Sequence, residues 1–364
     1  MNERSPDDPT EAGDRAAKKL KREARRRARE ARKRRRKEAR KAARKAEKQR
    51  RRQSGFGRIT NSDFLKRRVA GLVRFIFKWD RAMGRERASA IAAGVAPTVG
   101  RLSRENRVAA ANLAAAYPDK SEAERAKMLT AVWGNLARQT MEYPFLQDLA
   151  DAFDPSNPHD GVVMVDGLDH AYALRDGGRA GIIFGAHLGN WELVAAVGAR
   201  IGLTLTALYR PPANPYVAEE IERLRDGFYD QMVVSGRGAA LKIASTLARG
   251  RHVGVVIDQR IGAGQLIPFF GRPSLSNPVI GWLARRYECP VHGAYAIRLP
   301  DGRFRITMTP ALDLPRDADG KIDAEEANIV VHGMVEQWIR ENPEQWLWLH
   351  DRWRYGRRRD KRQY

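Results

Sequence analysis

Residues 180–192, AGIIFGAHLGNWE, join an apolar run to a short polar turn and to the start of a second apolar run. The first six residues predict a buried strand, and residues 193–199, LVAAVGA, predict a helix. The turn between them carries His187 and, five positions later, Glu192. We predict that Asn190 is the helix N-cap, which places Glu192 in the first helical turn and leaves His187 on the loop.

An imidazole and a carboxylate at this spacing indicate acid–base chemistry. The Glu192 carboxylate can reach back to one ring nitrogen of His187, which fixes the tautomer and raises the basicity of the other nitrogen. Such a pair can take the proton from a substrate hydroxyl that attacks a thioester, without a serine or cysteine nucleophile. The alternative is a structural hydrogen bond that steadies the turn. Asn190 also has two open roles, capping alone or the presentation of helix N-terminal N–H groups to a developing oxyanion.

Three further polar residues, Arg210, Asp258 and Gln259, lie just after strand-like runs. Because ligands of open α/β sheets bind beyond the carboxyl ends of the strands, we expect these side chains to share one crevice with His187. Arg210 fits either an ion pair with Glu192 or Asp258, or a contact with a phosphate or the thioester oxygen. For Asp258 and Gln259 we expect an architectural or acceptor-positioning role. Further candidate phosphate contacts are Arg237, Arg260 and Arg298.

Strand-like and helix-like runs alternate from residue 162 onward, which predicts an α/β domain over residues 151–356. We expect a central mixed, largely parallel sheet flanked by helices, ending in an antiparallel pair across the turn Asp301-Gly302. The expected strands are 162–165, 181–184, 203–209, 232–234, 253–257, 291–299 and 303–309. The expected helices are 170–175, the one after Asn190, 216–229, 239–249, 278–286 and 325–341.

Residues 54–150 are expected to form a helical, membrane-associating region. Residues 64–81 place apolar side chains such as Leu72 and Trp79 on one face, and Arg67 and Arg74 recur on another. Such a stripe fits a core helix or an interfacial helix. Extra aromatic residues, the basic polar face and the cationic segment upstream favour the interfacial helix.

The positive charge is concentrated at the N-terminus. The chain has a formal net charge of +23, and residues 1–53 hold 24 Lys/Arg against 9 Asp/Glu, a net charge of +15. Leu20 is the only large aliphatic residue between Arg15 and Arg52. We therefore predict a disordered tail or a solvated helix, which would be attracted to anionic lipids or to nucleic acid. Residues 357–364 form a second, short basic tail.

Several classes of protein lack their signatures in this chain. The single cysteine, Cys289, excludes an internal disulfide and fits a reducing compartment. There is no P-loop, no complete dinucleotide-binding glycine motif, no Gly-x-Ser-x-Gly elbow and no metal-ligand spacing. The longest stretch without Asp, Glu, Lys or Arg, residues 88–100, is too short to span a bilayer. We also see no signal peptide, and we expect neither a metal nor a tightly bound cofactor.

The His-x4-Glu motif at a strand-to-helix turn resembles the glycerolipid acyltransferase superfamily. The variant HLGNWE is similar to its lipid A biosynthesis branch, the lauroyl/myristoyl acyltransferases. The resemblance spans residues 64–354 and includes further blocks in the same order. These are 112–118 (NLAAAYP), 208–212 (LYRPP), 256–259 (VIDQ), 267–271 (IPFFG) and 342–353 (NPEQWLWLHDRW).

This resemblance implies a glycerolipid-acyltransferase-like fold and a peripheral enzyme on the cytoplasmic face of the cell inner membrane. The enzyme would move a fatty acyl chain from acyl carrier protein, or from CoA, to a hydroxyl of a lipid A precursor. Its partners would be acyl carrier protein, anionic membrane lipids and the glycolipid acceptor. His187 would be the general base, and Glu192 would hold it. The residues expected to bind substrate are Asn190, Arg210, Asp258 and Gln259.

An apolar groove must hold the acyl chain, and we expect Trp191, Phe269 and Phe270 in its wall. His350 lies among Trp346, Trp348 and Trp353, a group that is assigned to packing or interface anchoring. One alternative is acylation of another glycolipid or of a phospholipid. A different class, a nucleic-acid-binding protein acting through residues 1–53, leaves the His187 turn unexplained. Nucleic acid is therefore not the expected partner.

Overall fold

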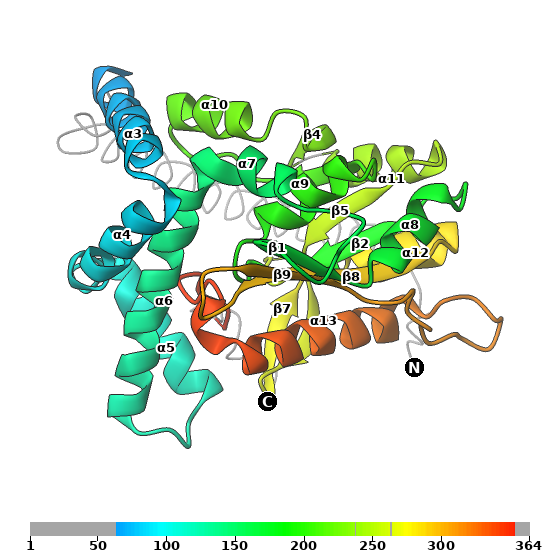
Figure 1. Cartoon of the computed structure of the whole chain (residues 1–364). Helices are drawn as coiled ribbons and strands as arrows, with labels where there is room; N and C mark the ends of the chain where they lie inside the picture. Colours follow the sequence, from blue (N-terminus) through cyan, green and yellow to red (C-terminus); the bar gives the residue numbers. More distant parts are fainter. Residues whose placement is uncertain (1–62, 237, 263, 354–364) are drawn as a thin grey trace, which may run out of the picture. The chain divides into compact units, whose positions relative to one another are not determined.

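The computed structural model describes residues 63–236, 238–262 and 264–353 (Figure 1). The two predicted basic tails lie outside these residues. The chain divides into two units, Met1–Val69 and Ala70–Tyr364. The sheet and the site described below belong to the second unit.

A mixed seven-stranded sheet forms the centre of this second unit. Its strand order is β1-β9-β8-β2-β5-β3-β4, and every neighbouring pair is parallel except β8 and β9. The α/β class and the antiparallel pair across Asp301-Gly302 are thus confirmed. The strands are β1 (Val163–Asp166), β2 (Ile182–Gly185), β3 (Leu205–Tyr209), β4 (Tyr229–Val234), β5 (Val253–Val256), β8 (Val291–Arg298) and β9 (Phe304–Met308).

Helices cover both faces of the sheet (Figure 1). Because successive side chains of a strand point to opposite faces, β2 supplies two separate cores. Ile182 and Phe184 pack with α11, α12 and α13, whereas Ile183 packs with α7, α8 and α9. The helices are α7 (Leu146–Asp151), α8 (Leu168–Asp176), α9 (Glu192–Arg200), α10 (Pro215–Leu224), α11 (Ala239–Ala248), α12 (Val279–Tyr287) and α13 (Ala324–Glu341).

One predicted helix differs from the structure, and one hairpin in the structure was not predicted. The helix predicted over 216–229 ends at Leu224, because Gly227 adopts a φ of 82° and Tyr229 already begins β4. A hairpin of β6 (Gln265–Phe269) and β7 (Arg272–Ser276) was not predicted. It places Pro268 opposite Pro273, and proline is depleted in strands, so the sequence pattern hid both strands.

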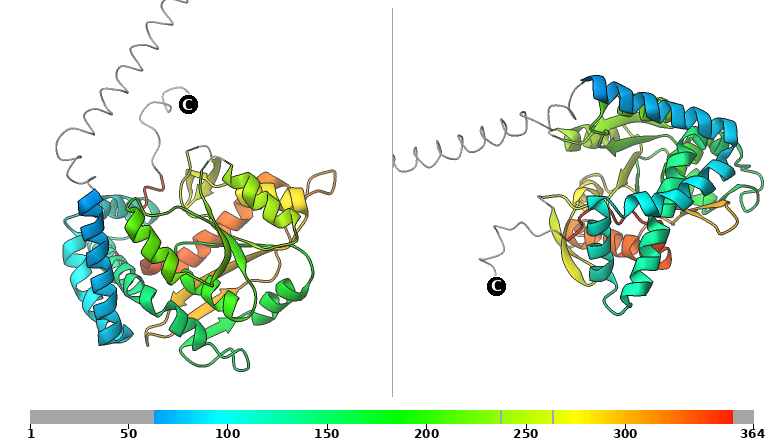
Figure 2. Two further views of the ribbon diagram at one scale, coloured as in Figure 1. Left: turned by 90° about the horizontal axis from the view of Figure 1, so that it is seen from above. Right: turned by 90° about the vertical axis from the view of Figure 1, so that its left-hand side faces the viewer.

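The helices that precede β1 are α3 (Asp63–Met83), α4 (Arg85–Gly100), α5 (Arg104–Ala116) and α6 (Glu122–Glu142), followed by η1 (Tyr143–Phe145). The cyan helices α4, α5 and α6 stand together beside the sheet (Figure 2). The helix predicted over 64–81 is confirmed as α3. Among the described residues, no helix combines the length and the apolar character that a bilayer crossing requires.

The C-terminal segment, residues 342–353, packs beneath the turn that follows β2. It begins with η2 (Pro343–Gln345) and buries Trp346 and Trp348 in the core shared with α11, α12 and α13. The Asn112 side chain on α5 donates hydrogen bonds of 2.7 Å to the backbone carbonyls of Trp348 and His350. Two sequence blocks far apart in the chain, 112–118 and 342–353, are therefore joined directly.

Candidate active site

The His187 turn leaves the carboxyl end of β2, as the sequence predicts, and enters α9 at Glu192. Gly189 has a φ of 54°, and a Cβ built there would lie 2.0 Å from the carbonyl oxygen of Ala296. Only glycine fits such an approach. Two backbone hydrogen bonds tie the turn to the C-terminal segment, from Gly189 N–H to the Gln345 carbonyl (2.9 Å) and from Leu347 N–H to the His187 carbonyl (3.0 Å).

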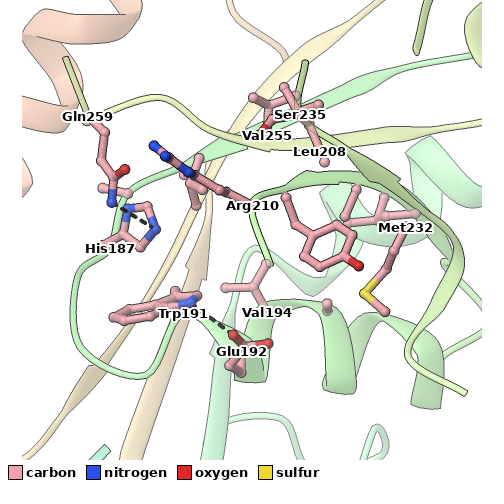
Figure 3. Close-up of a pocket in the computed structure, with 18 of the residues that line it drawn as sticks. His187, Trp191, Glu192, Val194, Leu208, Arg210, Met232, Ser235, Val255 and Gln259 are labelled. Atoms are coloured by element: carbon pink, nitrogen blue, oxygen red, sulfur yellow. Dashed lines mark hydrogen bonds between the residues drawn. The ribbon is translucent and has the colours of Figure 1, made fainter. Parts of the chain in front are cut away.

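The partner of the His187 imidazole is Asp258, two residues beyond the end of β5. The ring Nδ1 lies 2.8 Å from Asp258 Oδ1, and the His187 backbone N–H donates to Oδ2 at 3.0 Å. Because β2 and β5 are adjacent and parallel, their carboxyl ends bring the two residues together. The other ring nitrogen, Nε2, lies 3.5 Å from the Gln259 amide (Figure 3).

The electrostatics of this buried pair favour an ionised Asp258. Burial opposes ionisation of the carboxyl group, but the His187 imidazole and the N–H donors outweigh burial and hold the pKa of Asp258 well below its usual value. Burial likewise opposes protonation of His187. The charge of Asp258 and its hydrogen bond overcome this cost, so the pKa of His187 lies above its usual value.

Glu192 does not hold His187, so this prediction is wrong. Its buried carboxylate forms an ion pair with Arg225, including a 2.9 Å hydrogen bond from Nε. It also accepts hydrogen bonds from the Tyr143 hydroxyl (2.7 Å) and the Trp191 indole N–H (3.0 Å). The guanidinium supplies the full counter-charge that a buried carboxylate needs. Asp258, not Glu192, is the carboxylate that meets a ring nitrogen of His187.

A cavity of about 640 Å³ opens beside this turn, between α9 and one face of the sheet (Figure 3). The sheet side of the cavity leaves space for a ligand because Gly254 has no side chain and Ala207 has only a methyl group. These two residues pair in register and lie between Ile183 and Met232, so the four form one row across β2, β5, β3 and β4. Other apolar lining residues are Val194, Ala195, Leu205 and Ala294.

Residues 58–355 match the sequence model of the family described as bacterial lipid A biosynthesis acyltransferase. This chain belongs to that family. The chain is 25% identical over 261 residues to the lipid A biosynthesis palmitoleoyltransferase of Escherichia coli (strain K12). It is 26% identical over 268 residues to the lipid A biosynthesis lauroyltransferase of the same strain. Each match covers 70% of this chain and 80% of the relative.

Asn190 does not cap α9 in this family member. The N-cap is Trp191, with helical backbone angles and no side-chain capping bond. Asn190 is buried instead, and its Nδ2 donates to Glu142 at 2.8 Å. Glu142 also pairs with Arg298, so Arg298 is not free to bind a phosphate. The loop therefore uses Asn190 to attach itself to α6, and α9 begins one residue later than predicted.

The shared-crevice prediction is confirmed in part. The cavity mouth carries Arg210 and Gln259, together with Arg260, but buried Asp258 does not line the cavity. Arg210 is exposed, and in the described part of the chain no carboxylate pairs with it. Its predicted ion pair with Glu192 or Asp258 does not form, because Arg225 and His187 occupy those carboxylates. Arg237 lies outside the described residues.

The predicted cavity wall is correct in part. Trp191 lines the cavity, and its ring centroid lies 4.9 Å from that of His187. Phe269 and Phe270 are buried in an aromatic cluster with Trp346, Trp348 and Trp353, and they do not line the cavity. The hairpin that carries these two phenylalanines was not predicted, which explains the error.

The two buried carboxylates should respond differently to neutralisation. Asp258→Asn removes the anion beside His187 and should lower the pKa of that histidine, which NMR titration of the imidazole signals would measure. Glu192→Gln should lower the pKa of His187 less than Asp258→Asn does. It should also cost about 3–5 kcal/mol of unfolding free energy, because Arg225 is left buried without its counter-charge. Urea unfolding measures this cost, with the exposed Glu86→Gln as control. Equal effects of both variants on the pKa of His187 would contradict the assignment.

Proposed function

We propose that this chain is a lipid A acyltransferase that moves a fatty acyl chain from a thioester to a hydroxyl of a lipid A precursor. The observation that carries the proposal is the His187 imidazole, held by buried Asp258 at the edge of a largely apolar cavity of about 640 Å³. The family and the activities in the names of its two Escherichia coli relatives support the reaction and the class of acceptor.

His187 acts as the general base in the proposed reaction. Since Asp258 accepts the Nδ1 proton, neutral His187 carries its lone pair on Nε2. Nε2 removes the proton of the acceptor hydroxyl while the hydroxyl oxygen attacks the thioester carbonyl carbon. The tetrahedral intermediate then collapses, the carbon–sulfur bond breaks, and the departing thiolate takes the proton back from the imidazolium. The products are an ester and a free thiol.

Two residues at the cavity mouth are suited to bind the reactants. Gln259 lies 3.5 Å from His187 Nε2, so its amide can orient the acceptor hydroxyl against the base. Arg210 is exposed beside the cavity and can contact a phosphate or the thioester oxygen. We propose acyl carrier protein as the donor, because an acidic carrier would be attracted to a chain of net charge +23.

Direct transfer is favoured over a covalent acyl-enzyme. Cys289 is buried, does not line the cavity, and burial raises the pKa of its thiol to about 11. The thiolate, which is the nucleophilic form, is therefore scarce near neutral pH.

Removing the base should abolish turnover. His187→Ala is expected to lower kcat about 10²–10⁴-fold with an acyl thioester donor and a lipid A precursor as acceptor. The exposed His159→Ala and the buried Cys289→Ala should keep their activity. Mass spectrometry of enzyme quenched after mixing with donor alone should find no acyl adduct. A His187→Ala enzyme within a few-fold of wild type, or a stable adduct, would overturn the mechanism.

The space left by Gly254 and Ala207 in the cavity wall should limit the length of the acyl chain. Ala207→Leu fills part of this space and should shift the enzyme's preference toward donors with shorter acyl chains. Excluding two methylenes costs about 1.6 kcal/mol, or roughly tenfold in the ratio of long to short product. Product analysis with mixed donors measures this ratio. Ala248→Leu on the exposed end of α11 should leave it unchanged. An unchanged ratio in Ala207→Leu would place the acyl chain elsewhere.

We further propose that the protein works on the cytoplasmic face of the inner membrane as a peripheral enzyme. The exposed face of α3 carries Leu72, Phe75 and Trp79, with 43–66% of each side chain accessible, and Arg74 and Lys78 are also exposed on this helix. On α4, Ile91, Val95 and Val99 are exposed at four-residue spacing. Apolar stripes flanked by cations suit the interface of an anionic bilayer.

This membrane contact has an apolar and an electrostatic part that can be separated. A Phe75→Ser/Trp79→Ser double variant should float less with anionic vesicles at both low and high salt. Deleting residues 1–53 removes a net charge of +15 and should weaken flotation chiefly at low salt. Leu241→Ser, an exposed apolar residue on α11, is the control. Flotation of the double variant equal to that of wild type would contradict the proposed face.

A further inference from the structure

The Trp346 side chain lies behind the His187–Asp258 pair. It is buried, and its indole N–H donates a 2.7 Å hydrogen bond to Asp258 Oδ2. The carboxylate therefore accepts three N–H donors, two from His187 and one from Trp346. Packing or interface anchoring, the role expected from the sequence, does not require this bond.

The neighbouring tryptophans of the same segment show that the contact is specific. The Trp348 indole N–H donates to the backbone carbonyl of Pro343 at 2.6 Å. The Trp353 indole N–H donates to the backbone carbonyl of Phe269 at 3.2 Å. All three rings are buried, but Trp346 is the one whose N–H meets a carboxylate.

We propose that Trp346 is a positioning residue that holds the Asp258 carboxylate against His187 and moderates the negative charge that the carboxylate presents to the imidazole. This inference rests on the proposed function, because it assigns Trp346 a part in the work of the base.

A buried carboxylate is stabilised by few hydrogen-bond donors, so each N–H that reaches Asp258 affects its charge. A hydrogen bond from a neutral N–H stabilises the carboxylate most when the imidazole is neutral, because the imidazolium then does not compensate the charge. Removing the indole N–H therefore favours the state in which His187 is protonated. The proton affinity of the base should rise, and less neutral imidazole should be present at a given pH.

The other charged and titratable groups around the pair do not replace this donor. Those that act electrostatically on Asp258 or His187 are Glu192 and Arg225 at the cavity, His332 on α13, and His350 and Arg352 in the C-terminal segment. Arg260 lies at the cavity mouth, and its backbone N–H donates to His350. All of these groups remain in a Trp346→Phe variant, so a change of the titration would report the lost N–H.

The test is the pH dependence of kcat/KM in Trp346→Phe. The acid limb, where activity is lost as His187 takes up a proton, should move to higher pH by about half a unit. At pH values below the limb midpoint, kcat should fall about threefold with little change in KM. The matched control Trp348→Phe removes an equally buried indole N–H that meets a carbonyl, and its limb should not move. Asp258→Asn should move the limb in the opposite direction.

A second measurement uses the wild-type protein, so it stands even if Trp346→Phe fails to fold. The Trp346 indole N–H signal should titrate by NMR with the midpoint of the His187 ring signals, whereas that of Trp348 should not. The inference would be overturned by a Trp346 N–H signal that does not change with the His187 titration. An acid limb of kcat/KM that does not move in folded Trp346→Phe would also overturn it. An active His187→Ala enzyme would instead overturn the proposed function, so the two failures are distinguishable.

Discussion

The hydrogen bond between His187 Nδ1 and Asp258 is the interaction on which the rest of the site depends. A buried carboxylate is tolerated only when its charge is compensated and its oxygens are hydrogen-bonded. The fold meets this demand with the carboxyl ends of two adjacent parallel strands and with an indole from a distant segment. Backbone hydrogen bonds to Gln345 and Leu347 fix the turn itself. These contacts explain why a short loop can hold an imidazole in one orientation.

A second buried pair, Glu192 with Arg225, leaves Asp258 as the carboxylate that meets His187. Asp258 orients the imidazole and raises its pKa. The ion pair of Glu192 with Arg225 joins the start of α9 to the segment after α10. Tyr143 and Tyr229 surround the second pair, and burial, followed by the Glu192 charge, raises the pKa of both phenols. Their hydroxyls therefore remain protonated donors to the carboxylate.

Local sequence patterns predicted most of the helices and strands, but they did not predict which distant residues contact one another. The strand, turn and helix around His187 are readable because apolar periodicity acts over a few residues. The order of strands in the sheet is not readable in this way. Glu192, five positions away, therefore looked like the partner of His187, although Asp258 lies 71 positions away in the chain. Arg225 and Trp346 were missed for the same reason, since an arginine after a helix and a tryptophan among tryptophans carry no local sign of their contacts.

The sequence position of Trp346 also bears on how the protein is made. Synthesis proceeds from the N-terminus, so β2, β5 and Asp258 leave the ribosome before Trp346, which lies 88 residues later. Until then the carboxylate lacks its third donor and the His187 turn lacks its backbone bonds to Gln345 and Leu347. A nascent chain therefore presents an unfinished site until the ribosome has translated through this segment.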